Sequence, residues 1–296
     1  MDATELLRKV RHIEIKTRML SDNVFAGQYH SAYKGRGMSF DEVREYQAGD
    51  DMRDIDWNVT ARFGHPFTKL YNEERELTVL LLVDVSSSLT CGAHAGSAGD
   101  IVAEIGATLA FSADLNNDKI GVVFFSDRIE KYISPQKGRK HILYIIRELI
   151  ELTPEGRTTD LGNALEFVIN TQKKRCALFI LSDFISCGDF ETPLNIAARK
   201  HDIAAIEVYD RFMKQLPDVG LIKMIDSETG EDVIVDSSSL RIRKAHAAHW
   251  LKHEERLKRV FGDCGVDYAS LTTEDNYVDE LSKLFKNRSR SVGHRR

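Results

Sequence analysis

Residues 78–88 read TVLLLVDVSSS, an apolar run that ends at Asp84 and leads into three serines. A continuous run of Val and Leu, without alternating polar residues, is typical of a strand buried on both faces of a parallel sheet. Similar runs lie at residues 119–125 and 177–181, with helix-like segments near 100–115 and 161–172. Buried strands that alternate with helices predict a doubly wound, Rossmann-type α/β domain with a mostly parallel sheet.

The alternation continues toward the C-terminus, with one interruption. Between residues 216 and 235, two alternating runs joined by the turn-rich SETGE predict an inserted β-hairpin, and a long charged helix follows near 238–260. The whole insertion covers residues 213–262. The remaining predicted strands lie at 128–133, 203–208 and 267–270, and the remaining predicted helices at 138–152, 190–199 and 275–285.

The N-terminal quarter of the chain has a different pattern. Residues 4–20 have the apolar spacing of an amphipathic helix, whereas residues 27–75 are irregular, with a strand-like piece in PFTKLY at 66–71. We therefore predict an N-terminal module at 1–76, the α/β domain at 77–285 and a basic tail at 286–296. We interpret that tail as a solvated end.

The stretch GDDMRDIDW in the N-terminal module is dense in charge. We predict that its charged residues form internal ion pairs that lock the module onto the α/β domain, with Trp57 as a buried anchor. An exposed docking surface is the alternative. The charged residues concerned are Asp50, Asp51, Arg53, Asp54 and Asp56.

The composition is that of an ordinary globular protein. Charged residues make up 29% and hydrophobic residues 42%, and the formal net charge is −5, which argues against a globally basic nucleic-acid binder. No apolar stretch is long enough to span a bilayer, and the first residues carry charges throughout, so we expect a cytoplasmic protein. The scattered cysteines suit reduced thiols and form no CxxC pair: Cys91, Cys176, Cys187 and Cys264.

Polar side chains follow two of the predicted strands and precede one helix. In an open parallel sheet, ligands bind outside the carboxyl ends of the strands, where these loops should meet. Mg²⁺ and Mn²⁺ prefer about six oxygen ligands and accept hydroxyls and waters among them. The predicted metal ligands are Asp84, Ser86, Ser88, one threonine of the Arg157-Thr158-Thr159-Asp160 stretch, and Asp183.

The motifs DVSSS, RTTDL and SD resemble the metal-ion-dependent adhesion site of von Willebrand factor type A domains. The pattern of that site is DxSxS, a threonine and a second aspartate. The resemblance implies a von Willebrand factor A-like domain whose metal keeps one position open for a carboxylate of a partner protein. Counting back from Asp160-Leu161 favours Thr159 as the ligand, whereas counting forward from Gly156 favours Thr158.

The sequence from Tyr33 to Glu76, which runs directly into the first predicted strand, resembles the signature of the bacterial domain-of-unknown-function family 58. Members of that family are typically encoded beside MoxR-type AAA+ ATPases. The resemblance therefore implies an adaptor or co-chaperone that acts with such an ATPase on a client protein, and not an enzyme. The chain itself has no Walker A sequence, so nucleotide hydrolysis would belong to the partner.

Several other functions remain as alternatives. A metal-dependent phosphate-ester hydrolase at the same site is the main one, although Ser86 stands where a phosphatase-like site would have its second acid. His246 and His249 lack a third ligand at similar spacing, so a histidine metal site is disfavoured. Nucleic-acid binding through the basic tail is a further possibility that we do not expect.

Overall fold

The computed structural model describes residues 38–47, 50–73, 77–90, 97–185, 187–225 and 232–294. The chain divides into two compact units, one formed by Lys34–Glu76 and the other containing all of the chain from Leu77 onward. We call these the small unit and the sheet domain. The predicted helix at 4–20 lies outside the described residues.

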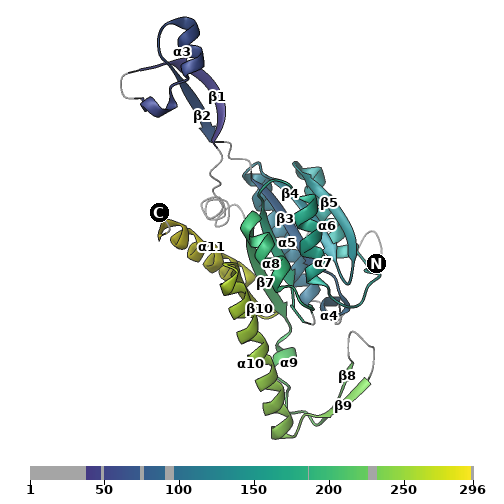
Figure 1. The fold of residues 1–296 in the computed structure, drawn as a ribbon. Helices are drawn as coiled ribbons and strands as arrows, with labels where there is room; N and C mark the ends of the chain where they lie inside the picture. Colours follow the sequence, from purple (N-terminus) through teal and green to yellow (C-terminus); the bar gives the residue numbers. More distant parts are fainter. Residues whose placement is uncertain are drawn as a thin grey trace. The chain divides into compact units, whose positions relative to one another are not determined.

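The sheet domain contains a six-stranded sheet in the order β10-β7-β6-β3-β4-β5 (Figure 1). All neighbouring strands pair in parallel except β4 and β5, which are antiparallel. The predicted doubly wound, mostly parallel α/β fold is therefore confirmed. The strands are β3 (Thr78–Asp84), β4 (Lys119–Phe125), β5 (Ile129–Gln136), β6 (Ala177–Ser182), β7 (Asp202–Tyr209) and β10 (Asp267–Thr272).

Helices cover both faces of this sheet, which explains why its central strands are apolar throughout. In β3, Leu81 faces a core formed with one set of helices, while Leu80 and Leu82 face the core formed with the other set. The first set is α5 (Ala98–Leu115), α6 (Arg139–Glu151) and α11 (Tyr277–His294). The second set is α7 (Leu161–Thr171), α8 (Glu191–Lys200) and α10 (Leu240–Asp263).

The predicted insertion follows β7. It begins with the short helix α9 (Arg211–Lys214), continues through the antiparallel hairpin β8 (Leu221–Ile225) and β9 (Asp232–Asp236), and returns through α10. The C-terminal half of α10 packs on the sheet through Leu257, Val260 and Phe261, which are all buried. Its N-terminal half extends away from the sheet (Figure 1), so the insertion is attached mainly through α9 and the end of α10.

The small unit is a two-stranded antiparallel sheet with two short helices. Its elements are β1 (Met38–Glu45), η2 (Met52–Asp54), α3 (Trp57–Phe63) and β2 (Phe67–Glu73). Strand β1 has a bulge between Phe40 and Glu42, which breaks the alternation by which a strand is recognised in a sequence.

The prediction that Trp57 is a buried anchor is wrong, because its side chain is 69% exposed. Asp56 caps the N-terminus of α3 by accepting hydrogen bonds from two backbone amides, and Trp57 is the first residue of that helix. The ion pairs of Asp50 with Arg44 and of Asp56 with Lys69 both stay within the small unit. The charged stretch thus organises its own unit.

The interpretation of residues 286–296 as a solvated end is wrong at Arg288. Helix α11 continues without a break to His294, across the expected boundary at 286. Arg288 is only 9% exposed and forms ion pairs with Asp202, at 2.9 Å, and with Asp267. These carboxylates belong to β7 and β10, so Arg288 fixes α11 against the sheet edge.

Candidate metal centre

Strands β3 and β6 are hydrogen-bonded neighbours, with Val83 opposite Leu181. This register places the ends of both strands at the same edge of the sheet. Asp84 is the last residue of β3, and Ser182 is the last residue of β6. The Ser182 hydroxyl donates a 2.6 Å hydrogen bond to Oδ2 of Asp84, so the two strand ends are joined through their side chains.

The loop after β3 folds back over Asp84. The backbone amide of Ser86 donates to Oδ1 of Asp84 at 2.9 Å, an Asx-type turn that a short carboxylate favours. The hydroxyls of Ser86 and Ser88 lie 3.0 Å apart. Two serine hydroxyls are therefore held next to the first carboxylate.

A third loop, at residues 156–160, packs against the loop after β3. Both the amide and the hydroxyl of Ser87 donate to the carbonyl of Arg157, at 3.2 and 2.8 Å. The amide of Gly156 donates to Oε1 of Glu130 at 2.8 Å, which fixes the start of the loop. A β-carbon at Gly156 would lie 2.0 Å from Oδ1 of Asp127, so only glycine fits there without a rearrangement.

This third loop brings Thr159 to the site, and not Thr158. Thr159 is 7% exposed and its hydroxyl hydrogen-bonds to Asp84, whereas Thr158 is exposed to solvent. Asp160, the next residue, has a different role: its Oδ1 accepts a hydrogen bond from the Asn163 amide at 2.9 Å and caps α7.

The second carboxylate, Asp183, lies directly after β6 and is 3% exposed. Its Oδ1 accepts a 3.0 Å hydrogen bond from the amide of Ile185. Between them, Phe184 has a left-handed backbone with φ of 54°, which is uncommon outside glycine. The buried Phe184 ring packs on Phe261 of α10 at 5.1 Å, and this packing holds the sharp turn in place.

The two carboxylates share one electrostatic environment. Burial raises the pKa of Asp84, against the hydrogen bonds from Ser182, Ser86 and Thr159, which lower it. Burial, followed by the negative charge of Asp84, raises the pKa of Asp183 to about 7, although the Ile185 amide and the Ser88 hydroxyl act to lower it. All five predicted ligand residues thus belong to one hydrogen-bonded group.

The charges of Asp84 and Asp183 are not balanced by an ion pair with any described residue. In the described parts of the chain, no Lys, Arg or His side chain forms an ion pair with Asp84 or Asp183. Nor do these parts contain a cluster of three or more His, Cys, Asp or Glu side chains of the kind that holds a metal through those residues alone. A cation here would depend on two carboxylates together with hydroxyls and water. Such an all-oxygen set fits Mg²⁺ or Mn²⁺ and does not fit a soft metal.

The sequence analysis missed two residues that shape the site around Asp84 and Asp183. Ser182 appeared only as the residue before Asp183, although it orients Asp84. Glu207 interrupts the apolar run of β7 near the end of the strand, opposite Ser182 in the sheet, and its charge raises the pKa of Asp183. A single acidic residue inside a buried strand was the available signal, because such a charge is retained only with partners.

A family model described as "Protein of unknown function DUF58" matches residues 42–256. The chain belongs to the DUF58 family. This confirms the resemblance seen in residues 33–76. Relatives of this DUF58 chain include "Uncharacterized protein Rv1480" of Mycobacterium tuberculosis, which is 29% identical over 99% of this chain and 94% of its own length.

Solved structures similar to this DUF58 chain include the conserved hypothetical protein BatB from Bacteroides thetaiotaomicron. It is 13% identical, with a TM-score of 0.45 over 72% of this chain and 99% of BatB. Another is the SpRpn10 VWA domain, 12% identical, with a TM-score of 0.39 over 72% of this chain and 95% of that domain. In the described residues of the DUF58 chain, no helix is long and apolar enough to cross a membrane.

Proposed function

We propose that this chain is a metal-dependent protein-interaction module. In this proposal Asp84 and Asp183 supply the negative charge for one Mg²⁺ or Mn²⁺ ion, and three hydroxyls complete the protein's share of the ligands. Those hydroxyls belong to Ser86, Ser88 and Thr159.

The observation that carries the proposal is a pair of buried carboxylates for which the described residues supply no ion-pair partner. Two ionised carboxylates in a buried site repel each other, and burial without a partner costs several kcal/mol for each charge. A divalent cation would offset both charges at once. The surrounding hydroxyls are oxygen donors that a hard cation accepts, which supports a cation at this place more than a shared proton.

The residues of the chain would fix the ion and leave it accessible. Ser182 and the Ser86 amide orient Asp84, and the Ile185 amide orients Asp183, so neither carboxylate needs to reorganise when a cation binds. When bound, the ion would supply a Lewis-acidic position that accepts a carboxylate oxygen of a partner protein. No nucleophile or general base is required for such a role, so we propose binding and not turnover.

The family suggests the partner. The resemblance of residues 33–76 to family 58 implies a MoxR-type AAA+ ATPase, for which this chain would be an adaptor toward a client protein. An ATPase partner fits a chain that has no Walker A sequence of its own.

A pull-down from native cell extract tests this function, with wild type, Asp84→Asn and Asp189→Asn as baits, each in Mg²⁺ and in chelator. Asp189 is exposed and lies in the loop after β6, so its variant removes one charge from the same region without touching the buried pair. We expect an AAA+ ATPase to be retained by wild type and Asp189→Asn in Mg²⁺, and by neither in chelator. Retention by Asp84→Asn equal to that of wild type would contradict the proposal.

A further inference from the structure

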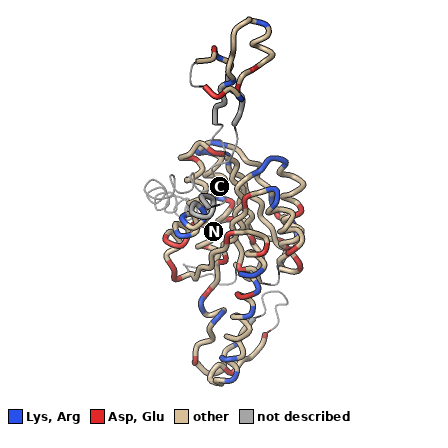
Figure 2. Tube along the Cα trace, turned by 60° about the vertical axis from the view of Figure 1, so that its left-hand side comes forward, with Lys and Arg blue, Asp and Glu red and all other residues tan. Residues whose placement is uncertain are grey.

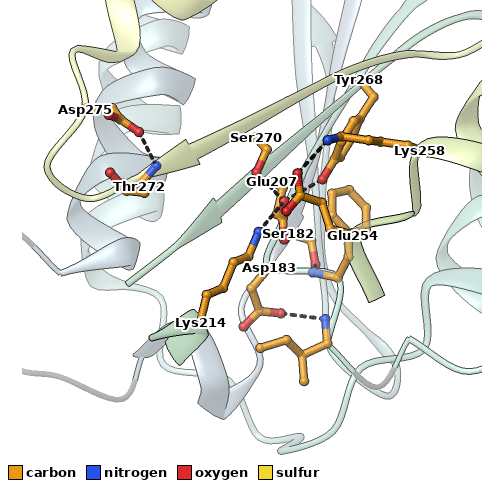
Figure 3. A network of polar contacts seen from close by, with 12 residues as sticks. Ser182, Asp183, Glu207, Lys214, Glu254, Lys258, Tyr268, Ser270, Thr272 and Asp275 are labelled. Atoms are coloured by element: carbon orange, nitrogen blue, oxygen red, sulfur yellow. Dashed lines mark hydrogen bonds and ion pairs between the residues drawn. The ribbon is translucent and has the colours of Figure 1, made fainter. Parts of the chain in front are cut away.

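Glu207 is a fully buried carboxylate beside the candidate metal centre. It lies near the end of β7, is 0% exposed, and stands opposite Ser182 in the sheet. Tyr268 and Ser270 of β10 donate hydrogen bonds of 2.5 Å each to its Oε2. Figure 3 shows these donors converging on Glu207, with Asp183 nearby. This network is not needed to hold a metal, yet it occupies the same edge of the sheet.

The positive charge in this network comes from the insertion. Lys214, the last residue of α9, places Nζ 3.1 Å from Oε1 of Glu207 and is itself only 11% exposed. The same Nζ lies 3.5 Å from the centre of the Tyr209 ring, a cation–π contact. The Glu207–Lys214 ion pair therefore connects the sheet edge with the first element of the insertion.

From α9 the contacts continue into α10. Nε2 of His246 lies 2.7 Å from the carbonyl oxygen of Met213, the neighbour of Lys214. The indole Nε1 of Trp250 lies 3.1 Å from the same nitrogen of His246. A groove of about 390 Å³ lies between α9 and α10, and Lys214 and Trp250 both line it.

The contacts that run from Glu207 through α9 to α10 should respond to a bound cation because of the charges at their start. The edge holds three buried carboxylates, those of Asp84, Asp183 and Glu207, and among the described residues the ammonium group of Lys214 is the one that forms an ion pair with them. A divalent cation between Asp84 and Asp183 would attract Glu207 and repel Lys214. At the low effective dielectric of a buried site, both effects reach beyond the first ligands.

We propose that Glu207 and Lys214 are a positioning pair that couples cation binding at Asp84 and Asp183 to the α9–α10 groove. This inference rests on the proposed metal site and adds its regulation: the cation both binds the partner's carboxylate and changes the groove beside it. Lys214 couples the two places because it belongs to α9 and forms an ion pair with the buried Glu207.

The test uses Trp250 as its reporter. The chain has two tryptophans, so Trp57→Phe leaves Trp250 as the only one. In that background, Mg²⁺ affinity is measured by calorimetry and the Trp250 emission is followed during the same titration. The variants are Lys214→Met, Glu207→Gln and the double variant. Lys131→Met is the matched control, because it removes the Lys131–Glu148 ion pair of 2.8 Å between β5 and α6.

We expect Mg²⁺ to shift the emission of Trp250 in the parent protein and in Lys131→Met. Lys214→Met should lose the shift while binding Mg²⁺ roughly threefold more tightly, because a repelling charge is gone. Glu207→Gln should bind Mg²⁺ roughly three- to tenfold more weakly. The double variant has the net charge of the parent, so it should bind with near-parental affinity and still lack the shift.

The possible failures are distinguishable. A parent protein that binds Mg²⁺ without any change at Trp250 would overturn the coupling and leave the metal site intact. A full emission shift in Lys214→Met would also overturn it. So would Mg²⁺ affinities of the single variants Lys214→Met and Glu207→Gln that equal the affinity of Lys131→Met. A parent protein that does not bind Mg²⁺ at all would overturn both proposals. Thermal melts in chelator verify that each variant is folded.

Discussion

The hydroxyl of Ser182 donates a 2.6 Å hydrogen bond to Oδ2 of Asp84, although 98 residues separate the two in the sequence. The bond exists because β3 and β6 are neighbours in the sheet, a relationship that only the parallel crossover topology creates. Together with the Ser86 amide on Oδ1, this bond holds both oxygens of Asp84. The fold thus orients the carboxylate.

Removing one of the two buried carboxylates should raise the free energy of unfolding without metal and lower it, relative to wild type, with metal. Asp183 is held at a raised pKa, about 7, by burial and by the charge of Asp84, so its ionised form is unfavourable in the metal-free protein. Asp183→Asn should therefore raise the free energy of unfolding in chelator at pH 8, by about 1 kcal/mol. In excess Mg²⁺ the wild type should gain stability, about 2.7 kcal/mol at a hundredfold excess over Kd, and the variant should not.

Thermal melts of the Asp183→Asn variant in chelator and in Mg²⁺ check this sign reversal. Asp189→Asn is the control and should respond to Mg²⁺ as the wild type does. Equal Mg²⁺ stabilisation of wild type and Asp183→Asn would show that Asp183 is not a ligand.

Substitutions of the two adjacent threonines should have very different effects on Mg²⁺ affinity. Thr159 is buried and bonds to Asp84, whereas Thr158 is exposed. Thr159→Val should weaken Mg²⁺ binding about tenfold, since it removes a hydroxyl worth roughly 1 kcal/mol or more at a charged site. Thr158→Val should leave the affinity unchanged. Calorimetry of both variants settles the choice, and a loss confined to Thr158→Val would reverse our assignment.

Gly156→Ala should disturb the loop that carries Thr159. The new methyl group would lie 2.0 Å from Oδ1 of Asp127 and 2.2 Å from Oγ of Ser126, so either these two side chains or the loop must shift. We expect a loss of about 1 to 3 kcal/mol in unfolding free energy, together with weaker Mg²⁺ binding.

Gly262→Ala is the matched control for that variant. No atom lies within 4 Å of its added methyl group, and Gly262 is inside helix α10, so alanine should stabilise the protein by about 0.5 to 1 kcal/mol. Urea unfolding measures both changes. Equal effects of the two substitutions would mean that the 156–160 loop is not closely packed.

His201 should make stability depend on pH. Burial lowers its pKa to about 4, helped by the charges of Lys200 and Arg175, and its Nδ1 lies 3.3 Å from Sγ of Cys176. Between pH 6.5 and 4 the unfolded chain takes up a proton that the folded protein refuses, so stability falls as the pH falls through this window. His201 accounts for a fall of up to about 3 kcal/mol in the free energy of unfolding, and below pH 4 its effect changes no further.

The His201→Gln variant, which cannot titrate there, measures this contribution. Its unfolding free energy should be lower than that of wild type at pH 7 but should decline less between pH 6.5 and 4.5. Parallel pH profiles for the two proteins would exclude His201 as the source.

Arg288 should contribute far more to stability than a surface arginine. It is 9% exposed and pairs with Asp202 and Asp267 on neighbouring strands, so Arg288→Met leaves two carboxylates without this partner. We expect this variant to lose about 3 kcal/mol in free energy of unfolding. Arg147→Met, which breaks an exposed pair with Glu151 within α6, should cost less than about 0.5 kcal/mol. Similar melting temperatures for the two variants would contradict the role given to α11.

The sequence was sufficient for the sheet domain because its strands are continuous apolar runs, and such runs require helices on both faces. It was insufficient where a residue's environment comes from distant parts of the chain. Arg288 looks like part of a charged tail until β7 and β10 supply its carboxylates. The choice between Thr158 and Thr159 depends on which one the packed loop turns toward Asp84, and local spacing contains no such information.

Trp57 illustrates a different limit. A large aromatic residue is usually buried, but the local cap at Asp56 starts a helix at Trp57, and the side chain is exposed on the small unit. Acidic and basic residues are interspersed over the sheet domain (Figure 2), so charge patterning alone does not mark the candidate site. Its two informative carboxylates are buried, and the fold is needed to see that they lie together.

Direct titration with Mn²⁺ or Mg²⁺ tests the central claim, that Asp84 and Asp183 hold a divalent cation. Calorimetry is run on wild type, Asp84→Asn and the control Asp189→Asn, after treatment with chelator and buffer exchange. The account predicts one ion per chain for wild type and the control, and no measurable binding for Asp84→Asn. Wild type that takes up neither ion, or Asp84→Asn that binds as tightly as wild type, would contradict it.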